Sequence, residues 1–169
     1  MHRDVKPMNL MLCVQGGRHD VVKLLDFGLV KEIGGGHEEQ LTQPTKISGT
    51  LLYLAPERLR APDRVDARTD IYSLGAVAFY LLTGKHHLSG GTDADLLDRI
   101  LRQEPVAPSK RTDQPIPPEL DELVRACLSK EMDERPADTA AVLAVLDSIK
   151  SLEPWTEERA ASWWRAHRG

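Results

Sequence analysis

Four polar side chains near the start of the chain have types and a spacing that could do chemistry together. Asp4, Lys6 and Asn9 lie close together in the sequence, and Asp26 follows a short apolar run. On an extended segment Asp4 and Lys6, two residues apart, point the same way. A carboxylate can accept a proton, an ammonium group can offset negative charge, and carboxylate and amide oxygens bind hard cations. Singly, each residue reads as a solvated charge or part of a turn, so the interpretation depends on the set.

Three sequence blocks supply the context for these side chains. They are His2–Asn9 (HRDVKPMN), Asp26–Gly28 (DFG) and Ala55–Glu57 (APE). In this order they resemble the catalytic loop, the metal-binding triplet and the end of the activation segment of protein kinases. The first block is specific by itself, whereas the two triplets are weak singly and gain weight from their order. The resemblance is to the C-terminal lobe of a eukaryotic-type kinase of the bacterial serine/threonine kind, and it covers residues 1–150.

The resemblance implies a role for each of the four side chains in transferring the γ-phosphate of ATP to a protein. Asp4 would orient the substrate hydroxyl and accept its proton, and Lys6 would reach the γ-phosphate. Lysine at this position implies that the acceptor is a serine or threonine hydroxyl. Asn9 and Asp26 would supply oxygen ligands to Mg²⁺ and thereby help to bind the nucleotide. The expected cofactors are therefore ATP and Mg²⁺, and the expected partners are protein substrates.

Further positions of the resemblance concern the shape of the site. Phe27 would dock into the core of the lobe, and Gly28 would let the chain turn sharply after the metal ligand. Thr50, which precedes the third block, would hydrogen-bond near Asp4 and Lys6 and help to position the substrate. These residues are expected to shape the site and not to carry the reaction.

Three other positions are expected to be structural. Asp70 resembles the family aspartate that holds the backbone of residues 2–3. Arg135 resembles the arginine that pairs with Glu57. A buried carboxylate requires a partner, so the second pairing is physically plausible as well as analogous.

A regulatory role is implied for the segment between the second and third blocks. An arginine beside the catalytic aspartate, here Arg3, is the arrangement by which this family senses a phosphate on its activation segment. Phosphorylation adds about −1.5 to −2 of charge and can order a loop by pairing with arginine. Thr42 and Thr45 are the first candidate sites and Ser48 the third, because Thr50 is assigned to positioning the substrate.

The elements that must position these residues begin with a predicted β-hairpin. Apolar runs at residues 10–14 and 21–25 flank a polar spacer that contains Gly16 and Gly17. Residues 29–54 lack sustained periodicity and predict a long functional loop. The helical signal begins at Thr69, and residues 71–82 are apolar nearly all round, which predicts a buried helix ended by Gly84.

Three amphipathic helices are predicted after the buried one. Their apolar faces are Leu96, Leu97, Ile100 and Leu101; then Leu120, Leu123, Val124, Cys127 and Leu128; then Val142, Leu146 and Ile149. The predicted fold is mainly α with a small β-hairpin, as in a kinase C-terminal lobe, within a complete domain of α+β class. Between helices, His86 and His87 lack further ligands at metal-binding spacing and predict a solvated loop.

Residues 151–169 form a second unit in this interpretation, a helical tail that holds all three tryptophans. A short helix that packs back on the lobe is the favoured interpretation. The alternative is an aromatic anchor for a partner protein, since tryptophan is common at the centres of interfaces.

Composition places limits on partners and location. With 22 Lys+Arg, 26 Asp+Glu and a pI near 5.9, the chain offers no electrostatic reason to bind nucleic acid or an anionic membrane. No apolar run is long enough to predict a membrane segment. The two cysteines, Cys13 and Cys127, are interpreted as reduced thiols of a cytoplasmic protein.

The 169 residues contain no Gly-rich phosphate loop and no strand lysine followed by a helix glutamate. An N-terminal lobe carrying these features is expected upstream, and a fragment, a misplaced start codon and a broken gene all remain open. Two classes of function follow: the catalytic half of a serine/threonine kinase, or a non-catalytic remnant that binds partners. The set of Asp4, Lys6, Asn9 and Asp26 favours the first, and an upstream in-frame Gly-rich loop would decide.

Overall fold

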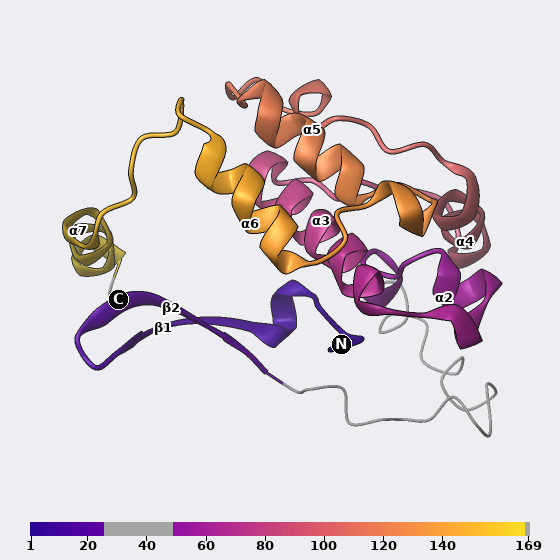
Figure 1. Cartoon of the computed structure of the whole chain (residues 1–169), viewed down its shortest axis with the longest axis horizontal. Coiled ribbons are helices and arrows are strands. Elements are labelled where there is room, and N and C mark those ends of the chain that lie inside the picture. Colours follow the sequence, from indigo (N-terminus) through magenta and orange to yellow (C-terminus); the bar gives the residue numbers. More distant parts are fainter. Residues whose placement is uncertain (26–48, 168–169) are drawn as a thin grey trace.

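A computed structural model describes residues 1–25 and 49–167 of the chain. A two-stranded hairpin occupies one side, and helices α2 to α6 gather on the other (Figure 1). In chain order the described elements are η1 (Pro7–Asn9), β1 (Leu10–Gln15), β2 (Arg18–Leu24), α2 (Glu57–Arg60), η2 (Pro62–Arg64), α3 (Ala67–Thr83), α4 (Asp93–Arg102), η3 (Pro108–Lys110), α5 (Pro118–Cys127), η4 (Met132–Glu134), α6 (Thr139–Ser148) and α7 (Glu157–His167). The predicted class, mainly α with a small hairpin, is confirmed.

The hairpin is antiparallel and pairs Leu10 with Leu24 and Cys13 with Val21. Gly16 and Gly17 form its turn, both with positive φ, a backbone conformation in which a side chain would be strained. The sequence prediction of a hairpin with a glycine turn is therefore confirmed. The first strand starts directly after Asn9, and the second strand ends at Leu24. The open end of the hairpin therefore lies next to the first sequence block, residues 2–9.

Helix α3 is the central helix of the structure, and its two ends explain its length. The Asp66 side chain accepts a hydrogen bond from the Arg68 amide at the start, and Gly84 adopts the left-handed conformation at the end. In between, Tyr72 and Phe79 are fully buried among residues that include Val124 of α5. The buried helix predicted from Thr69 to Leu82 is confirmed, with its start two residues earlier at Ala67.

Helices α4 and α5 confirm two of the amphipathic predictions. Helix α6 is present as predicted and buries Val142, but Leu146 is 37% exposed and Ile149 lies one residue beyond the end of the helix. Thr92 and Asp95 exchange hydrogen bonds in a capping box at the start of α4, and Asp138 caps α6. Pro118 opens α5. The apolar faces of α5 and α6 meet α3 in a core that contains Ile71, Leu123, Cys127 and Val142.

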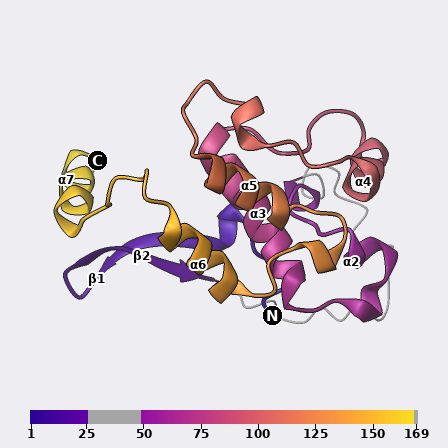
Figure 2. The same cartoon turned by 45° about the horizontal axis from the view of Figure 1, so that its top comes forward.

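The C-terminal helix α7 lies apart from the other helices and beside the turn end of the hairpin in both views (Figures 1 and 2). It packs against β2. The tail thus contains the expected helix, and the boundary near residue 150 stays a prediction. Within residues 1–25 and 49–167, no helix combines the length and apolar character needed to cross a bilayer.

Candidate active site

Asp4, Lys6 and Asn9 come together at the start of the chain. Lys6 is extended, and the single turn of η1 brings the Asn9 amide back to the Lys6 carbonyl at 2.9 Å. The Asn9 Nδ2 then donates to both the carbonyl and the Oδ2 of Asp4, each at 2.8 Å. Lys6 Nζ lies 2.8 Å from the same Asp4 Oδ2. A local turn therefore assembles three of the four predicted side chains.

The Asp4 carboxylate is the more accessible member of this group. Its side chain is 35% exposed, against 14% for Lys6, and Asn9 is buried. Asp4 can thus meet a substrate while the lysine and the amide hold its orientation. The arrangement fits a carboxylate that accepts a proton beside a fixed positive charge.

Asp70 at the start of α3 anchors the backbone that precedes Asp4. Its two carboxylate oxygens accept hydrogen bonds from the amides of His2 at 2.5 Å and Arg3 at 2.7 Å. Arg3 has φ 70°, an uncommon left-handed conformation for a residue with a side chain. The Arg58 guanidinium donates to the Arg3 carbonyl at 2.7 Å. Sequence reasoning assigned Asp70 to this contact but missed Arg58, for which the only signal was an arginine directly after the third block.

Glu57 and Arg135 form a buried, two-pronged ion pair. Both nitrogen–oxygen distances are 2.8 Å, and the side chains are 7% and 0% exposed respectively. Thr69 donates to Glu57 Oε1 at 2.7 Å, while Arg135 Nε donates to the Ser129 carbonyl at 2.8 Å. Burial acts to raise the pKa of Glu57, but the hydrogen bonds from Arg135 and Thr69 outweigh it and the pKa is lowered. The carboxyl end of the third block is thereby tied to the helical core.

The hairpin brings the chain back to Asn9. The Leu25 amide donates to the Asn9 carbonyl at 2.8 Å, directly before Asp26 in the sequence. Six predicted site residues lie outside the described residues: Asp26, Phe27, Gly28, Thr42, Thr45 and Ser48. The described part also contains no group of three or more histidine, cysteine, aspartate or glutamate side chains suited to a metal ion.

The structure describes the segment that contains Thr50, and a hydrogen bond joins this segment to α3. The Thr50 carbonyl accepts from the Tyr53 amide at 3.2 Å, and Ser73 Oγ donates to the Tyr53 carbonyl at 2.8 Å. Among the described residues, no hydrogen bond joins the Thr50 side chain to Asp4 or Lys6. Its role in positioning a substrate stays a prediction.

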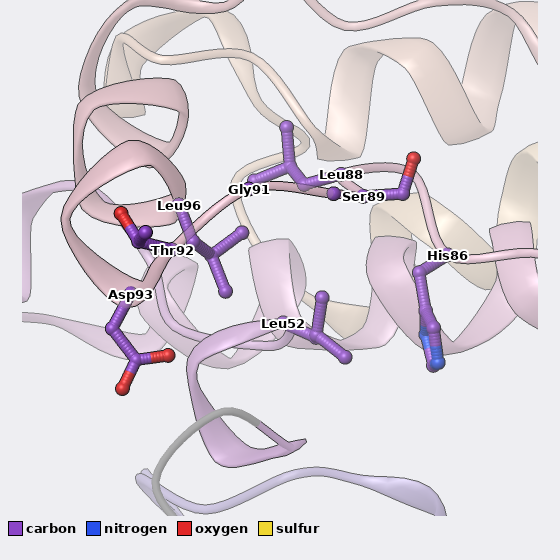
Figure 3. A pocket seen from close by; sticks show the side chains of 9 residues that line it. Leu52, His86, Leu88, Ser89, Gly91, Thr92, Asp93 and Leu96 are labelled. Atoms are coloured by element: carbon purple, nitrogen blue, oxygen red, sulfur yellow. The ribbon is translucent and has the colours of Figure 1, made fainter. Parts of the chain in front are cut away.

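A small pocket borders this segment. It has a volume of about 190 Å³, and Leu52, Leu88 and Leu96 surround it from three different stretches of chain (Figure 3). Ser89, Thr92 and Asp93 form its polar side. None of the residues predicted to act as acid, base or metal ligand lines this pocket. The pocket therefore shares no lining residue with the Asp4 group.

His86 and His87 correct the prediction of a solvated loop. His87 is 5% exposed, and its Nε2 lies 3.2 Å from the Tyr72 hydroxyl. Burial, and then the charge of Lys130, lowers the pKa of His87 to about 3. His86 stacks on Tyr80 with ring centroids 5.0 Å apart. The prediction was wrong because the chain folds back after Gly84 and packs these rings against α3 and near Lys130, which local polarity does not reveal.

Comparisons with known proteins agree with this geometry. The model of the protein kinase domain family matches residues 1–145. The chain is 37% identical over 146 residues to "Serine/threonine-protein kinase PknB" of Mycolicibacterium smegmatis, covering 86% of this chain and 22% of the relative. It is 35% identical over 154 residues to the protein of the same name from Mycobacterium tuberculosis, covering 91% and 24%. It is 32% identical over 151 residues to "Serine/threonine-protein kinase pkn3" of Myxococcus xanthus, covering 88% and 27%.

The chain spans about a quarter of the length of these relatives. The matched region contains the Asp4 group, the Asp70 anchor and the buried pair of Glu57 with Arg135. The chain belongs to the protein kinase family.

Proposed function

We propose that this chain supplies the catalytic half of an ATP-dependent serine/threonine protein kinase. The observation that carries the proposal is the Asp4 group: an accessible carboxylate held by Lys6 and Asn9 on a backbone fixed by Asp70. In this proposal Asp4 accepts the proton of a substrate hydroxyl, and Lys6 stabilises negative charge on the transferring phosphoryl group. Protein substrates with serine or threonine acceptors are the corresponding partners.

The residues present fit a nucleotide-bound magnesium ion. Both hydrogen bonds of Asn9 Nδ2 go to Asp4, which orients the amide and leaves Oδ1 without a hydrogen bond among the described residues. An amide oxygen is a suitable ligand for a hard cation, and the Asp26 carboxylate would be the second ligand. Bound Mg²⁺ would offset charge on the phosphates of ATP.

Substitution of Asp4 by asparagine tests the proposal. Asp4→Asn removes the proton acceptor but keeps an oxygen that can accept the Asn9 hydrogen bond. In the complete enzyme we expect kcat to fall about 10²- to 10⁴-fold, with an unchanged melting temperature. Asp63→Asn, at an exposed aspartate of η2, is the matched control and should keep full activity. A folded Asp4→Asn enzyme with near-normal turnover would contradict the proposal and favour the non-catalytic binding module.

We also propose that phosphorylation between the second and third blocks regulates the enzyme through Arg3. The backbone of Arg3 is held on both sides, while its exposed guanidinium makes no hydrogen bond to the described residues. Such a group is suited to pair with a phosphate. Phosphopeptide mapping of active enzyme should find Thr42 or Thr45 modified, with Ser48 as the third candidate. Full activity with no phosphate on this segment would contradict the proposal.

The proposed location is the cytoplasm. ATP-dependent transfer requires a compartment that supplies the nucleotide, and Cys13 and Cys127 are both free thiols. Alkylation of intact cells followed by mass spectrometry should recover both cysteines in the reduced form. Recovery of either as a disulfide would contradict this location.

A further inference from the structure

The Trp-rich tail makes a concentrated set of polar contacts with one point of the hairpin. The indole Nε1 atoms of Trp155 and Trp164 donate to the two carboxylate oxygens of Asp20, at 2.6 and 2.7 Å. These two hydrogen bonds join residues 135 and 144 positions apart in the sequence. They lower the pKa of Asp20, so the carboxylate is ionised at neutral pH. One side chain of β2 thus receives both donors from the tail.

The residue next to Asp20 is held by the same helix. Glu157, the first residue of α7, accepts from the His19 amide at 3.0 Å, and its Oε1 lies 2.5 Å from His19 Nδ1. Arg159 lies over the Trp155 ring, 5.5 Å from its centroid, and donates to Glu153 at 3.0 Å. Trp155 and Glu157 therefore contact two successive hairpin residues, Asp20 and His19, and Arg159 supports the Trp155 ring.

Asp20 has a backbone conformation that suits this contact. Its φ of 55° lies in the left-handed region, which few residues with side chains adopt and which aspartate and asparagine tolerate best. Strained conformations of this kind persist where the surroundings hold them in place. Here two indole donors meet the side chain, and Glu157 meets the neighbouring amide.

The hairpin has a physical need for such support. An isolated two-stranded hairpin is marginally stable in water. Three of its apolar side chains are exposed: Met11 by 41%, Leu12 by 46% and Val22 by 61%. Figures 1 and 2 show α7 against the turn end of the hairpin, away from helices α2 to α6. The contacts with the tail therefore stabilise the hairpin, which its two strands alone do not hold firmly.

We propose that α7 and Trp155 form a clasp on the hairpin, closed on Asp20, and that Asp20, Trp155 and Trp164 are positioning residues for the candidate metal-binding end of the site. The clasp holds the turn end of the hairpin. Its open end carries the hydrogen bond from the Leu25 amide to the Asn9 carbonyl, directly before Asp26. A loosened hairpin would let Asn9 and the start of the second block move relative to each other. This last step rests on the proposed function, whereas the clasp itself does not.

Hydrogen–deuterium exchange on the 169-residue chain tests the clasp. The double variant Trp155→Phe/Trp164→Phe keeps two aromatic rings but removes both indole donors. We expect the amides of β2 and the Leu25 amide to exchange about ten-fold faster or more, with no change in α3. Asp20→Asn, which tolerates the same backbone conformation, should shift the same amides in the same direction. Trp163→Phe is the matched control: Trp163 stacks on His167, and phenylalanine keeps an aromatic ring beside Trp164, so exchange should stay unchanged.

Unchanged exchange of the β2 amides in the double variant would overturn the clasp. Faster exchange in β2 with an unchanged Leu25 amide would overturn the positioning role. In the complete enzyme the double variant should raise KM for Mg²⁺–ATP several-fold more than it lowers kcat, and Trp163→Phe should match the parent. A parent enzyme that shows no phosphotransfer would contradict the proposed function and leave the exchange result standing.

Discussion

The buried ion pair of Glu57 with Arg135 connects α2 to the segment between α5 and α6. Arg135→Ala would leave a buried carboxylate without its partner, and also removes donors to the Ser129 and Arg68 carbonyls. We expect a loss of about 3–5 kcal/mol in the free energy of unfolding, measured by urea denaturation. A double-mutant cycle with Glu57→Gln should show strong coupling between the two positions.

The matched control is an arginine whose ion pair is exposed. Arg102 lies 2.7 Å from Asp98 one helical turn earlier, with side chains 77% and 62% exposed. Solvent screens this pair, so Arg102→Ala should change stability by at most about 0.5 kcal/mol. Additive effects of Glu57→Gln and Arg135→Ala would contradict the structural assignment.

Among the elements, the crossing of α3 and α5 depends on a glycine. A Cβ atom on Gly75 would lie 2.6 Å from the Cβ of Cys127 and 3.3 Å from Leu128, both buried. Alanine favours a helix over glycine by about 1 kcal/mol, but overpacking a core typically costs about 1–3 kcal/mol. We expect Gly75→Ala to lower the melting temperature, which differential scanning calorimetry measures.

Leu81 provides the comparison on the same helix. Its side chain is 75% exposed, so Leu81→Ala removes little buried surface and should change stability by about 0.5 kcal/mol or less. An increase in the melting temperature of Gly75→Ala would mean that helix propensity outweighs the packing of α3 on α5, and would contradict the close approach.

Over the whole molecule, the buried His87 makes stability depend on pH. Its pKa is lowered from 6.5 to about 3, so below pH 6.5 the unfolded chain binds a proton that the folded chain does not. The contribution to folding stability is complete above pH 6.5 and falls as the pH decreases, by up to about 1.4 kcal/mol per pH unit. Urea denaturation between pH 7 and 5 should show a shallower decline for His87→Gln than for the parent. If the free energy of unfolding fell equally with pH in the parent and in His87→Gln, His87 would have to be exposed to solvent in the folded protein.

The activity of these 169 residues by themselves is a second prediction for the whole molecule. Their sequence contains no motif that resembles the Gly-rich phosphate loop of kinases or the strand lysine that follows it. Positioning can contribute about 7–11 kcal/mol to lowering such a barrier. A radiolabel transfer assay on the purified chain should therefore match its Asp4→Asn variant. Transfer above that level would show that the described site suffices without these features.

Local patterns in the sequence were enough to predict the elements and the core of the candidate site. Apolar periodicity predicted α3 to α6, and paired glycines between apolar runs predicted the hairpin. Asp4, Lys6 and Asn9 could be grouped because one extended residue and one turn bring them together. These features follow from neighbours in the sequence, and neighbours determine turns, caps and the faces of helices.

Contacts between distant segments were decided only by the tertiary structure. The burial of His87 depends on Tyr72 and Lys130, and the docking of α7 depends on Asp20 in the opposite half of the chain. Periodicity identifies an apolar face but does not identify the segment that covers it. A polar side chain likewise has no fixed environment until its long-range partners are in place. The sequence therefore determined the family, the elements and the grouping of Asp4, Lys6 and Asn9, whereas packing decided which histidine is buried and where the tail binds.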